Sequence, residues 1–320
     1  MIGAHYYGWY GPDNHWSNGY TGTPVLGEYD SKDREVVNRH VEWASQHGID
    51  WFSATWWGPN SYSGRALRNH IAPALAGSPV EYSVLYEPKG RLSFDTDSGT
   101  ADLDEQHNRE RLAADLTQIA EAHTDRSSYL HVDGRPVVYV YIARTLVGDV
   151  AGAFAEAQSQ AGEQFYFIGD YGRRPQVPNL SVFDAVSPYN MYYPAADIND
   201  DFVAYVEDRY RRWRLLADRY DFRFVPNVLP GFDNTEAAWG EEDNPVLYRS
   251  PERYRRQCSV ARSVMDTDVP MALITSFNEW HEYTSVEPGE SFGTTYLEVT
   301  EGALDSGPIG GATDSLVPLT

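Results

Sequence analysis

Two glutamates lie three residues apart in a polar stretch that directly follows a short apolar run. The run spans residues 271–274, and the polar stretch is Asn278, Glu279, Trp280, His281 and Glu282. The apolar run predicts a buried strand, and a strand end is a rigid support for aiming a side chain. We therefore interpret Glu279 and Glu282 as candidate catalytic residues. The alternative is that they occupy a solvated helical face.

Two carboxyl groups are what glycoside hydrolysis usually requires, because one protonates the leaving oxygen while the other assists at the opposite face. If Glu279 and Glu282 lie close together they titrate as a pair, and one can stay protonated near neutral pH. Glu87 precedes Pro88 at the end of another predicted strand. It is either a third site residue or a salt-bridged residue at the rim. We expect His281 to orient its neighbours by hydrogen bonding rather than to act as a base.

The elements that would position these residues alternate along the chain. Short apolar segments bounded by Gly and Pro predict eight strands, at residues 5–10, 50–57, 81–87, 136–142, 164–170, 185–190, 223–229 and 271–274. Helical spacing predicts helices between most of them, at residues 33–47, 64–75, 104–123, 149–161, 202–220 and 251–265. This pattern favours a single-domain α/β fold, a (β/α)₈ TIM barrel of residues 1–300, followed by a loose tail of residues 301–320. The first strand is not followed by a Gly-rich phosphate loop, which disfavours a dinucleotide-binding sheet.

In a barrel of this kind the active site lies at the carboxyl ends of the strands. The predicted ends carry an aromatic and polar ring, composed of Tyr7, Trp9, Tyr10, Trp56, Trp57, Tyr86, Glu87, Tyr141, Asp170, Tyr189, Asn190, Tyr192 and Asn227. Aromatic faces stack against the C–H faces of sugars, and acids and amides bind hydroxyl groups. The ring therefore predicts a carbohydrate site. The alternative for any single ring is that it fills a large core.

The composition narrows the class of partner. The net charge of the 320-residue chain is −22 with a pI of about 4.7, which argues against nucleic acid. Only Lys32 and Lys89 are lysines among the 25 basic residues. Dispersed acidic residues with almost no lysine indicate a surface adapted to concentrated salt, as in a halophilic organism. A locally acidic substrate site is the competing interpretation.

The cysteine count and the lengths of the apolar runs bear on disulfides, metal sites and membrane association. Cys258 is the only cysteine and is expected to be buried in a helix, so disulfides and Cys-based metal sites are excluded. We expect neither a metal nor a cofactor. No apolar run approaches the roughly 18 residues that would span a membrane, and no signal peptide precedes the first strand. These features predict a cytoplasmic protein with no membrane partner.

With these motifs in place, the chain resembles glycoside hydrolase family 99, the endo-α-mannosidase and endo-α-mannanase group, and the wider set of WbsX-like domains encoded in polysaccharide gene clusters. The matching segments run in family order along nearly the whole chain, and the most specific is the stretch at 276–282. The others are at residues 6–10, 15–16, 48–50, 53–58, 86–88, 133–136, 230–234 and 286–288.

The resemblance implies a retaining mechanism without a protein nucleophile. Glu279 would act as a base on the 2-hydroxyl of the substrate, whose O2 attacks C1 to give a 1,2-anhydro sugar. Glu282 would protonate the departing oxygen and later activate water. This geometry requires a 2-hydroxyl trans to the leaving group, as in α-mannosides. The resemblance also implies sugar contacts from Glu87, from Asn278, from Tyr189 or Tyr192, and from Trp57 as a wall.

Two other functions stay open from the residues. One is a non-catalytic glycan-binding or polysaccharide-assembly barrel that retains the groove, although a binder has no need of both Glu279 and Glu282. The other is a conventional retaining glycosidase that uses Glu87 and Glu279 as acid and nucleophile, for which a carboxyl separation of roughly 5–5.5 Å is expected.

Overall fold

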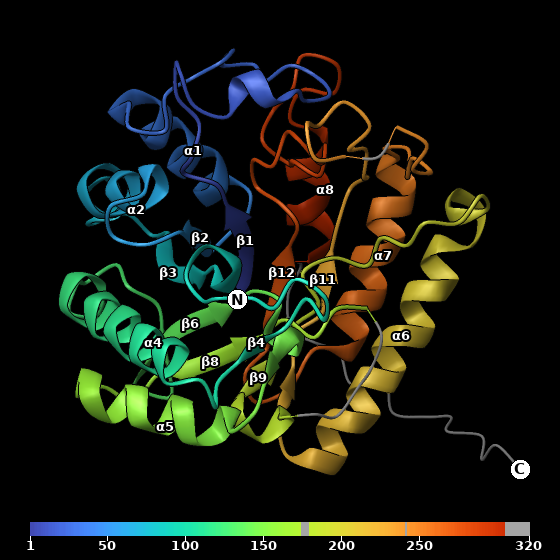
Figure 1. Cartoon of the computed structure of the whole chain (residues 1–320). Helices are drawn as coiled ribbons and strands as arrows, with labels where there is room; N and C mark the ends of the chain where they lie inside the picture. The colour runs from blue at the N-terminus through green and yellow to red at the C-terminus, as the bar shows by residue number, and fades with distance from the viewer. Residues whose placement is uncertain (174–178, 241, 305–320) are drawn as a thin grey trace, which may run out of the picture.

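A continuous parallel sheet runs through the computed structural model, which describes residues 1–173, 179–240 and 242–304 (Figure 1). Its strands, in spatial order, are β10 (Arg223–Phe224), β9 (Ala185–Val186), β8 (Tyr166–Gly169), β6 (Arg135–Val140), β3 (Glu81–Tyr86), β2 (Trp51–Trp56), β1 (Ile2–Tyr6), β12 (Ala272–Ile274) and β11 (Asn227–Val228).

The sheet closes on itself because β10 and β11, at the two ends of this order, are consecutive in the chain. Between them, the Val225 amide donates to the Val186 carbonyl (2.9 Å), and the Pro226 carbonyl accepts from the Leu273 amide (2.9 Å). Pro226 has no N–H and so interrupts the predicted seventh strand. One extended segment thereby bonds both edges of the sheet, and the predicted eight-stranded (β/α)₈ barrel is confirmed.

Helices surround the barrel, as Figure 1 shows. They are α1 (Arg34–Gln46), α2 (Tyr62–Ala66), α3 (Ala72–Leu75), α4 (Gln106–Ile119), α5 (Val150–Ala161), α6 (Ile198–Tyr220), α7 (Pro251–Val264) and α8 (Thr295–Leu304). The π-helical turn η2 (Leu67–Ile71) joins α2 to α3, and a similar turn, η4 (Ala120–Thr124), extends α4. Ser250 caps the start of α7, where its side chain accepts from the Arg253 amide (3.3 Å). Cys258 lies buried in α7 as expected.

Two differences from the predicted boundaries concern the first strand and the C-terminal tail. The first strand ends at Tyr6, so Tyr7, Trp9 and Tyr10 lie in the following loop rather than in a strand of residues 5–10. Residues 301–304, predicted to begin a loose tail, form the last turn of α8 because apolar side chains including Leu297 and Leu304 are buried there. Residues 305–320 lie outside the described part of the chain.

Three two-residue strands lie outside the barrel order given above. β4 (Ala101–Asp102) pairs with β7 (Leu146–Val147) above the barrel strands, and β5 (His131–Val132) forms an antiparallel hairpin with β6. The hairpin turns at Asp133 and Gly134, which have φ of 53° and 74°. Short 3₁₀ turns occur at η1 (Trp16–Asn18), η3 (Pro88–Gly90), η5 (Ala143–Thr145) and η6 (Leu180–Val182).

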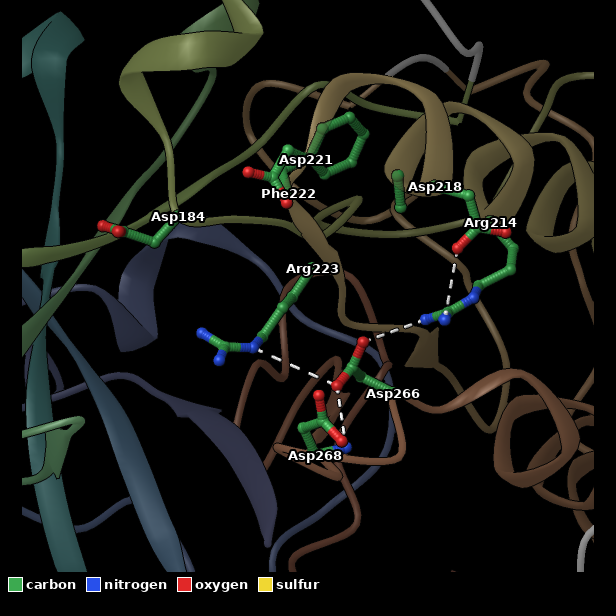
Figure 2. A pocket seen from close by; sticks show the side chains of 9 residues that line it. Asp184, Arg214, Asp218, Asp221, Phe222, Arg223, Asp266 and Asp268 are labelled. Carbon is green, nitrogen blue, oxygen red and sulfur yellow. Dashed lines mark hydrogen bonds and ion pairs between the residues drawn. The ribbon is translucent and has the colours of Figure 1, made fainter.

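An ion-pair network lies at the end of the barrel where the strands begin, opposite the carboxyl ends at which the active site is expected (Figure 2). A cavity of about 390 Å³ lies there, between the end of α6 and the segments that lead into β9, β10 and β12. Asp266 accepts from Arg214 (3.0 Å) and lies 4.0 Å from Arg223. These contacts join α6 to two strand starts, so we assign this end of the barrel to stability.

Candidate active site

The polar stretch forms a turn, residues 276–285, that is bonded to the end of β1. The Glu279 amide donates to Ser276 Oγ (2.7 Å), and the Phe277 amide donates to the His5 carbonyl (2.8 Å). Asn278 accepts from the Tyr7 amide (2.7 Å) and donates to the Tyr7 carbonyl (3.0 Å). The 276–285 turn and the loop after β1 are therefore held as one unit at the carboxyl end of the barrel.

Both glutamates of this turn are held by specific donors. Glu279 is buried, and its Oε1 accepts from the His281 amide (2.9 Å) and from the Tyr10 hydroxyl (3.4 Å). Glu282 is half-buried, and its Oε2 accepts from the Tyr189 hydroxyl (3.3 Å). The Tyr189 hydroxyl is also hydrogen-bonded to the Tyr7 hydroxyl. Because Tyr189 donates to Glu282, Tyr7 must donate to Tyr189.

The two carboxyl groups face one cavity of about 510 Å³. Its other walls come from loops that follow several barrel strands. The lining consists of Tyr7, Trp9, His15, Trp57, Glu87, Lys89, Tyr141, Tyr189, Trp239, Glu279 and Glu282. Three acids and several aromatic rings around a space of this size can hold a sugar by stacking and by hydroxyl recognition.

Burial perturbs all three carboxyl groups of the cavity. It raises the pKa of Glu282 to about 7, opposed by the hydrogen bond from Tyr189. Burial, and then the nearby Glu282 charge, raise the pKa of Glu279 well above its usual range. The pKa of Glu87 is raised to about 8, first by burial and then by Asp170 and Glu282, while Lys89 opposes the rise. Groups of this kind can exchange protons near neutral pH.

Residues 12–301 match the family model described as Glycosyl hydrolase family 99. The chain belongs to this family. Uncharacterized protein WxcX of Xanthomonas campestris pv. campestris (strain B100) is 28% identical over 229 residues, a match that covers 64% of this chain and 32% of WxcX. Glycoprotein endo-alpha-1,2-mannosidase of Mus musculus is 22% identical over 320 residues, covering 90% of this chain and 61% of the mouse protein. The chain thus spans about a third of WxcX and less than two thirds of the mouse relative.

Solved structures support the fold. The family 99 endo-alpha-mannosidase from Bacteroides thetaiotaomicron, in complex with bis-tris-propane, superposes with a TM-score of 0.74 at 21% identity. The match covers 95% of this chain and 96% of that one. The sequence match places the chain in a family of glycosyl hydrolases, and the structural match confirms the predicted barrel.

The cavity lining of this family 99 chain includes both predicted catalytic glutamates and several of the predicted ring residues, whereas Asn278, Tyr192, Tyr10 and His281 lie outside it. Asn278 bonds the Tyr7 backbone and also donates to the Tyr29 hydroxyl (3.1 Å), so both N–H groups of its amide already have protein partners. Tyr192 stacks on Phe232 (4.0 Å between centroids) and donates to the Pro245 carbonyl (2.8 Å). Of the two predicted tyrosines, the structure thus places Tyr189 in the cavity wall.

Tyr10 and His281 support the carboxyl groups from behind. The Tyr10 hydroxyl donates to Glu279, and its ring stacks on His281 (5.5 Å between centroids). His281 Nδ1 is 2.6 Å from the Gly19 carbonyl, so Nδ1 carries the proton and donates. Burial lowers the pKa of His281, which favours a neutral ring. The contacts suit the orienting role expected for this histidine rather than a base.

Three cavity residues were not predicted as site residues. His15 stacks on Trp9 (4.4 Å between centroids, 5° between planes), and its place in an aromatic stretch was the available signal. Lys89 follows Glu87 in the η3 turn, and its rarity as a lysine could have marked it. Trp239 lies edge-on to His281 (4.8 Å) from the long loop between β11 and α7. No strand-end signal marks that position.

Two buried hydrogen-bond networks that support the 276–285 turn were also not predicted. Glu287 accepts from Trp280 Nε1 (2.7 Å) and the Tyr29 hydroxyl (2.9 Å), and pairs with His40 Nε2 (3.0 Å). Arg249 donates to the Tyr283 carbonyl (2.9 Å) and the Ser285 carbonyl (2.7 Å). Both networks fix the 276–285 turn, whose position decides where the two glutamates point.

Asp170, predicted as part of the polar ring, is bonded within the protein. It accepts from the amides of Ile142 and Tyr189 (both 3.0 Å) and from Arg144 (2.8 Å). It therefore joins three neighbouring strand ends rather than offering an oxygen to a ligand.

Within residues 1–173, 179–240 and 242–304, no group of three or more His, Cys, Asp and Glu side chains is arranged to hold a metal ion. In the same part of the chain, no helix has both the length and the apolar character that crossing a bilayer requires.

Proposed function

We propose that this family 99 chain is a retaining glycosidase that cleaves α-mannoside-like glycans through a 1,2-anhydro sugar. The observation that carries the proposal is that Glu279 and Glu282, from one turn, line a single aromatic-walled cavity. The names of the mouse and Bacteroides relatives, an endo-alpha-1,2-mannosidase and an endo-alpha-mannosidase, support the choice of sugar.

Glu279 is suited to act on the 2-hydroxyl. Its carboxyl group is buried and held by the His281 amide and the Tyr10 hydroxyl, so its position is fixed. Burial and the nearby Glu282 charge raise its pKa, so the carboxylate, once ionised, is a stronger base than an exposed glutamate. The reaction uses the singly protonated state of the pair in which Glu279 is ionised and Glu282 carries the proton. In the first step Glu279 takes the proton of the 2-hydroxyl as O2 attacks C1 and the bond from C1 to the leaving oxygen breaks.

Glu282 is suited to act on the leaving oxygen. A pKa of about 7 leaves a large fraction of this carboxyl group protonated near neutral pH, as a general acid requires. In the first step its proton passes to the departing oxygen. In the second step Glu282 takes a proton from water, whose oxygen attacks C1 and opens the three-membered ring. Glu279 then returns its proton to O2, so both glutamates regain their starting states.

The remaining walls position the sugar. Trp9 and Trp57 supply aromatic faces, and the Glu87 Oε2 atom is buried without a protein partner among the described residues. A sugar hydroxyl that donates to this oxygen would satisfy it.

The experiment is a digestion screen of α-mannans and other glycans in concentrated salt. We expect Glu279→Gln and Glu282→Gln each to lower turnover at least about 10²-fold, as loss of a general base or acid does. Glu290→Gln is the matched control, because Glu290 is exposed and lies in the same region of the chain. Turnover at the wild-type rate in both Glu279→Gln and Glu282→Gln would contradict the assignment.

A further inference from the structure

One of the two lysines of the chain lines the candidate cavity, and the other contacts a residue that lines an adjoining cavity. The sequence has 25 Lys and Arg, of which only Lys32 and Lys89 are lysines, so 23 are arginines. Lys89 lines the cavity that contains Glu279 and Glu282. Lys32 Nζ lies 3.4 Å from the centroid of the Tyr62 ring, and Tyr62 lines an adjoining cavity of about 290 Å³. In a chain whose other basic residues are arginines, Lys89 lines one cavity and Lys32 contacts the lining of the next.

The two cavities form one groove, because Trp9, His15 and Trp57 line both of them. Lys89 is held beside this shared wall by the η3 turn. The Gly90 backbone packs so closely on Trp57 that an added Cβ would lie 2.2 Å from the indole ring. The backbone of Lys89 is therefore fixed, whereas its side chain is exposed and can reach a ligand in the groove.

The ammonium group of Lys89 is available to a ligand. Within the described part of the chain, Lys89 forms no ion pair with a carboxylate within 4.0 Å. Its acidic neighbours Glu87 and Glu282 have pKa values raised to about 8 and about 7, so near neutral pH they carry less negative charge than two ordinary glutamates. A flexible lysine is a compact point charge that suits an anionic oxygen without the fixed geometry of arginine.

We propose that the groove binds glycans carrying an anionic substituent, a carboxylate or a sulfate ester, against Lys89. The inference rests on the proposed function in taking a sugar as the ligand and α-mannan as its probe. It adds the charge of that sugar chain, which the catalytic pair does not determine. Lys89 attracts the Glu87 carboxylate from a longer distance, but among the described residues a neutral glycan would leave it without an ion pair within 4.0 Å.

The test compares one glycan in three forms. The probes are an α-mannan, the same mannan after oxidation of its primary hydroxyls to carboxylates, and the same mannan after sulfation. Affinities are measured at low and high salt. We expect the wild type to bind at least one anionic form about 10-fold more tightly than the parent, the effect of one hydrogen bond to a charged group. The carboxylate and sulfate arms distinguish the two sources of charge.

Variants assign the preference to Lys89. Lys89→Met should reduce the ratio of anionic to neutral affinity to about one, whereas Lys89→Arg should retain most of it. Arg34→Met removes the same charge from an exposed position on α1 and should leave the ratio unchanged. Equal affinity for all three forms, a preference that survives Lys89→Met, or no binding of any form would each overturn the inference. Hydrolysis of any glycan that depends on Glu282 would still support the proposed function, so the two failures are distinguishable.

Discussion

At the residue scale, the proton balance of the site depends on the hydroxyl chain from Tyr7 through Tyr189 to Glu282. The hydrogen bond from Tyr189 lowers the pKa of Glu282 while burial raises it. Since Glu282 must be protonated to act as the acid, this balance sets the pH at which activity is lost on the alkaline side.

Removing the Tyr189 hydroxyl should move that limit. We expect Tyr189→Phe to raise the pKa of Glu282, so the alkaline limb of the kcat/KM profile shifts to higher pH. Tyr141→Phe is the control, because Tyr141 lines the same cavity while Tyr189 is the residue that donates to Glu282. An unchanged or downward shift in Tyr189→Phe would contradict the assigned hydrogen bond.

Glu87 makes a prediction for stability rather than activity. Its folded-state pKa of about 8 lies above its ordinary value of 4.5, so its stabilising contribution is fully present below about pH 4.5 and is lost as the pH rises through 8. Glu87→Gln removes this loss. Thermal unfolding at pH 6 and pH 9 should show the variant gaining on the wild type at the higher pH, by roughly 3 kcal/mol at most, since about two pH units separate pH 6 from the folded-state pKa and each equals about 1.4 kcal/mol. A difference that is independent of pH would contradict the raised pKa.

The sequence identified the acids of the cavity because each lies just after a predicted strand. It could not show that Asn278 is used up by the Tyr7 backbone and Tyr29, because those partners are more than 200 residues away in the chain. It could not show Trp239 either, since that residue reaches the cavity from within a long loop.

At the element scale, the site depends on the loop after β1 docking against the loop between β11 and α7. The Ala238 amide donates to the Asn18 carbonyl (2.7 Å), and the Gly19 carbonyl accepts from His281. Gly19 has φ of 75°, and an added Cβ would lie 1.9 Å from the Glu236 carbonyl oxygen. The two loops meet where only glycine fits.

A pair of glycine variants tests this docking. Gly27 has φ of 67° with nothing within 4 Å of an added Cβ, so Gly27→Ala carries only the backbone penalty of about 1–2 kcal/mol. Gly19→Ala carries that penalty and also forces the loops apart. We expect it to destabilise more and to lower kcat/KM, measured by thermal unfolding and glycan turnover. Equal effects from the two variants would contradict the docking.

Strands and helices were predictable where breakers and apolar spacing agree, as for β2, β3 and α7. The first strand was placed too far along the chain because its aromatic residues favour extended structure, whereas its register with β2 ends at Tyr6 and Ala54. Helix α8 was not predicted. Its residues 295–300 follow a polar turn, and its residues 301–304 were assigned to the tail. The end of β1 depends on its pairing partners and the formation of α8 depends on its packing face, and neither can be read from the sequence.

At the scale of the whole molecule, a net charge of −22 on 320 residues favours expansion by self-repulsion. We predict that the melting temperature at pH 7 rises between about 0.1 M and about 1 M NaCl, because the screening length falls from about 10 Å to about 3 Å. At a pH near the pI of about 4.7 the net charge is small, and the salt effect should shrink. A melting temperature that is insensitive to salt at pH 7 would contradict a surface dominated by repulsion.

In the proposed mechanism the nucleophile is the substrate's own 2-hydroxyl, activated by Glu279. The most direct measurement compares an α-1,2-linked mannotetraose with its analogue that lacks the 2-hydroxyl on the sugar whose bond is cleaved. We predict that the parent is hydrolysed with retained configuration and that the analogue still binds but turns over at least about 10²-fold more slowly. Hydrolysis of the analogue at a comparable rate with retained configuration would contradict the claim and assign the nucleophile to a protein carboxylate.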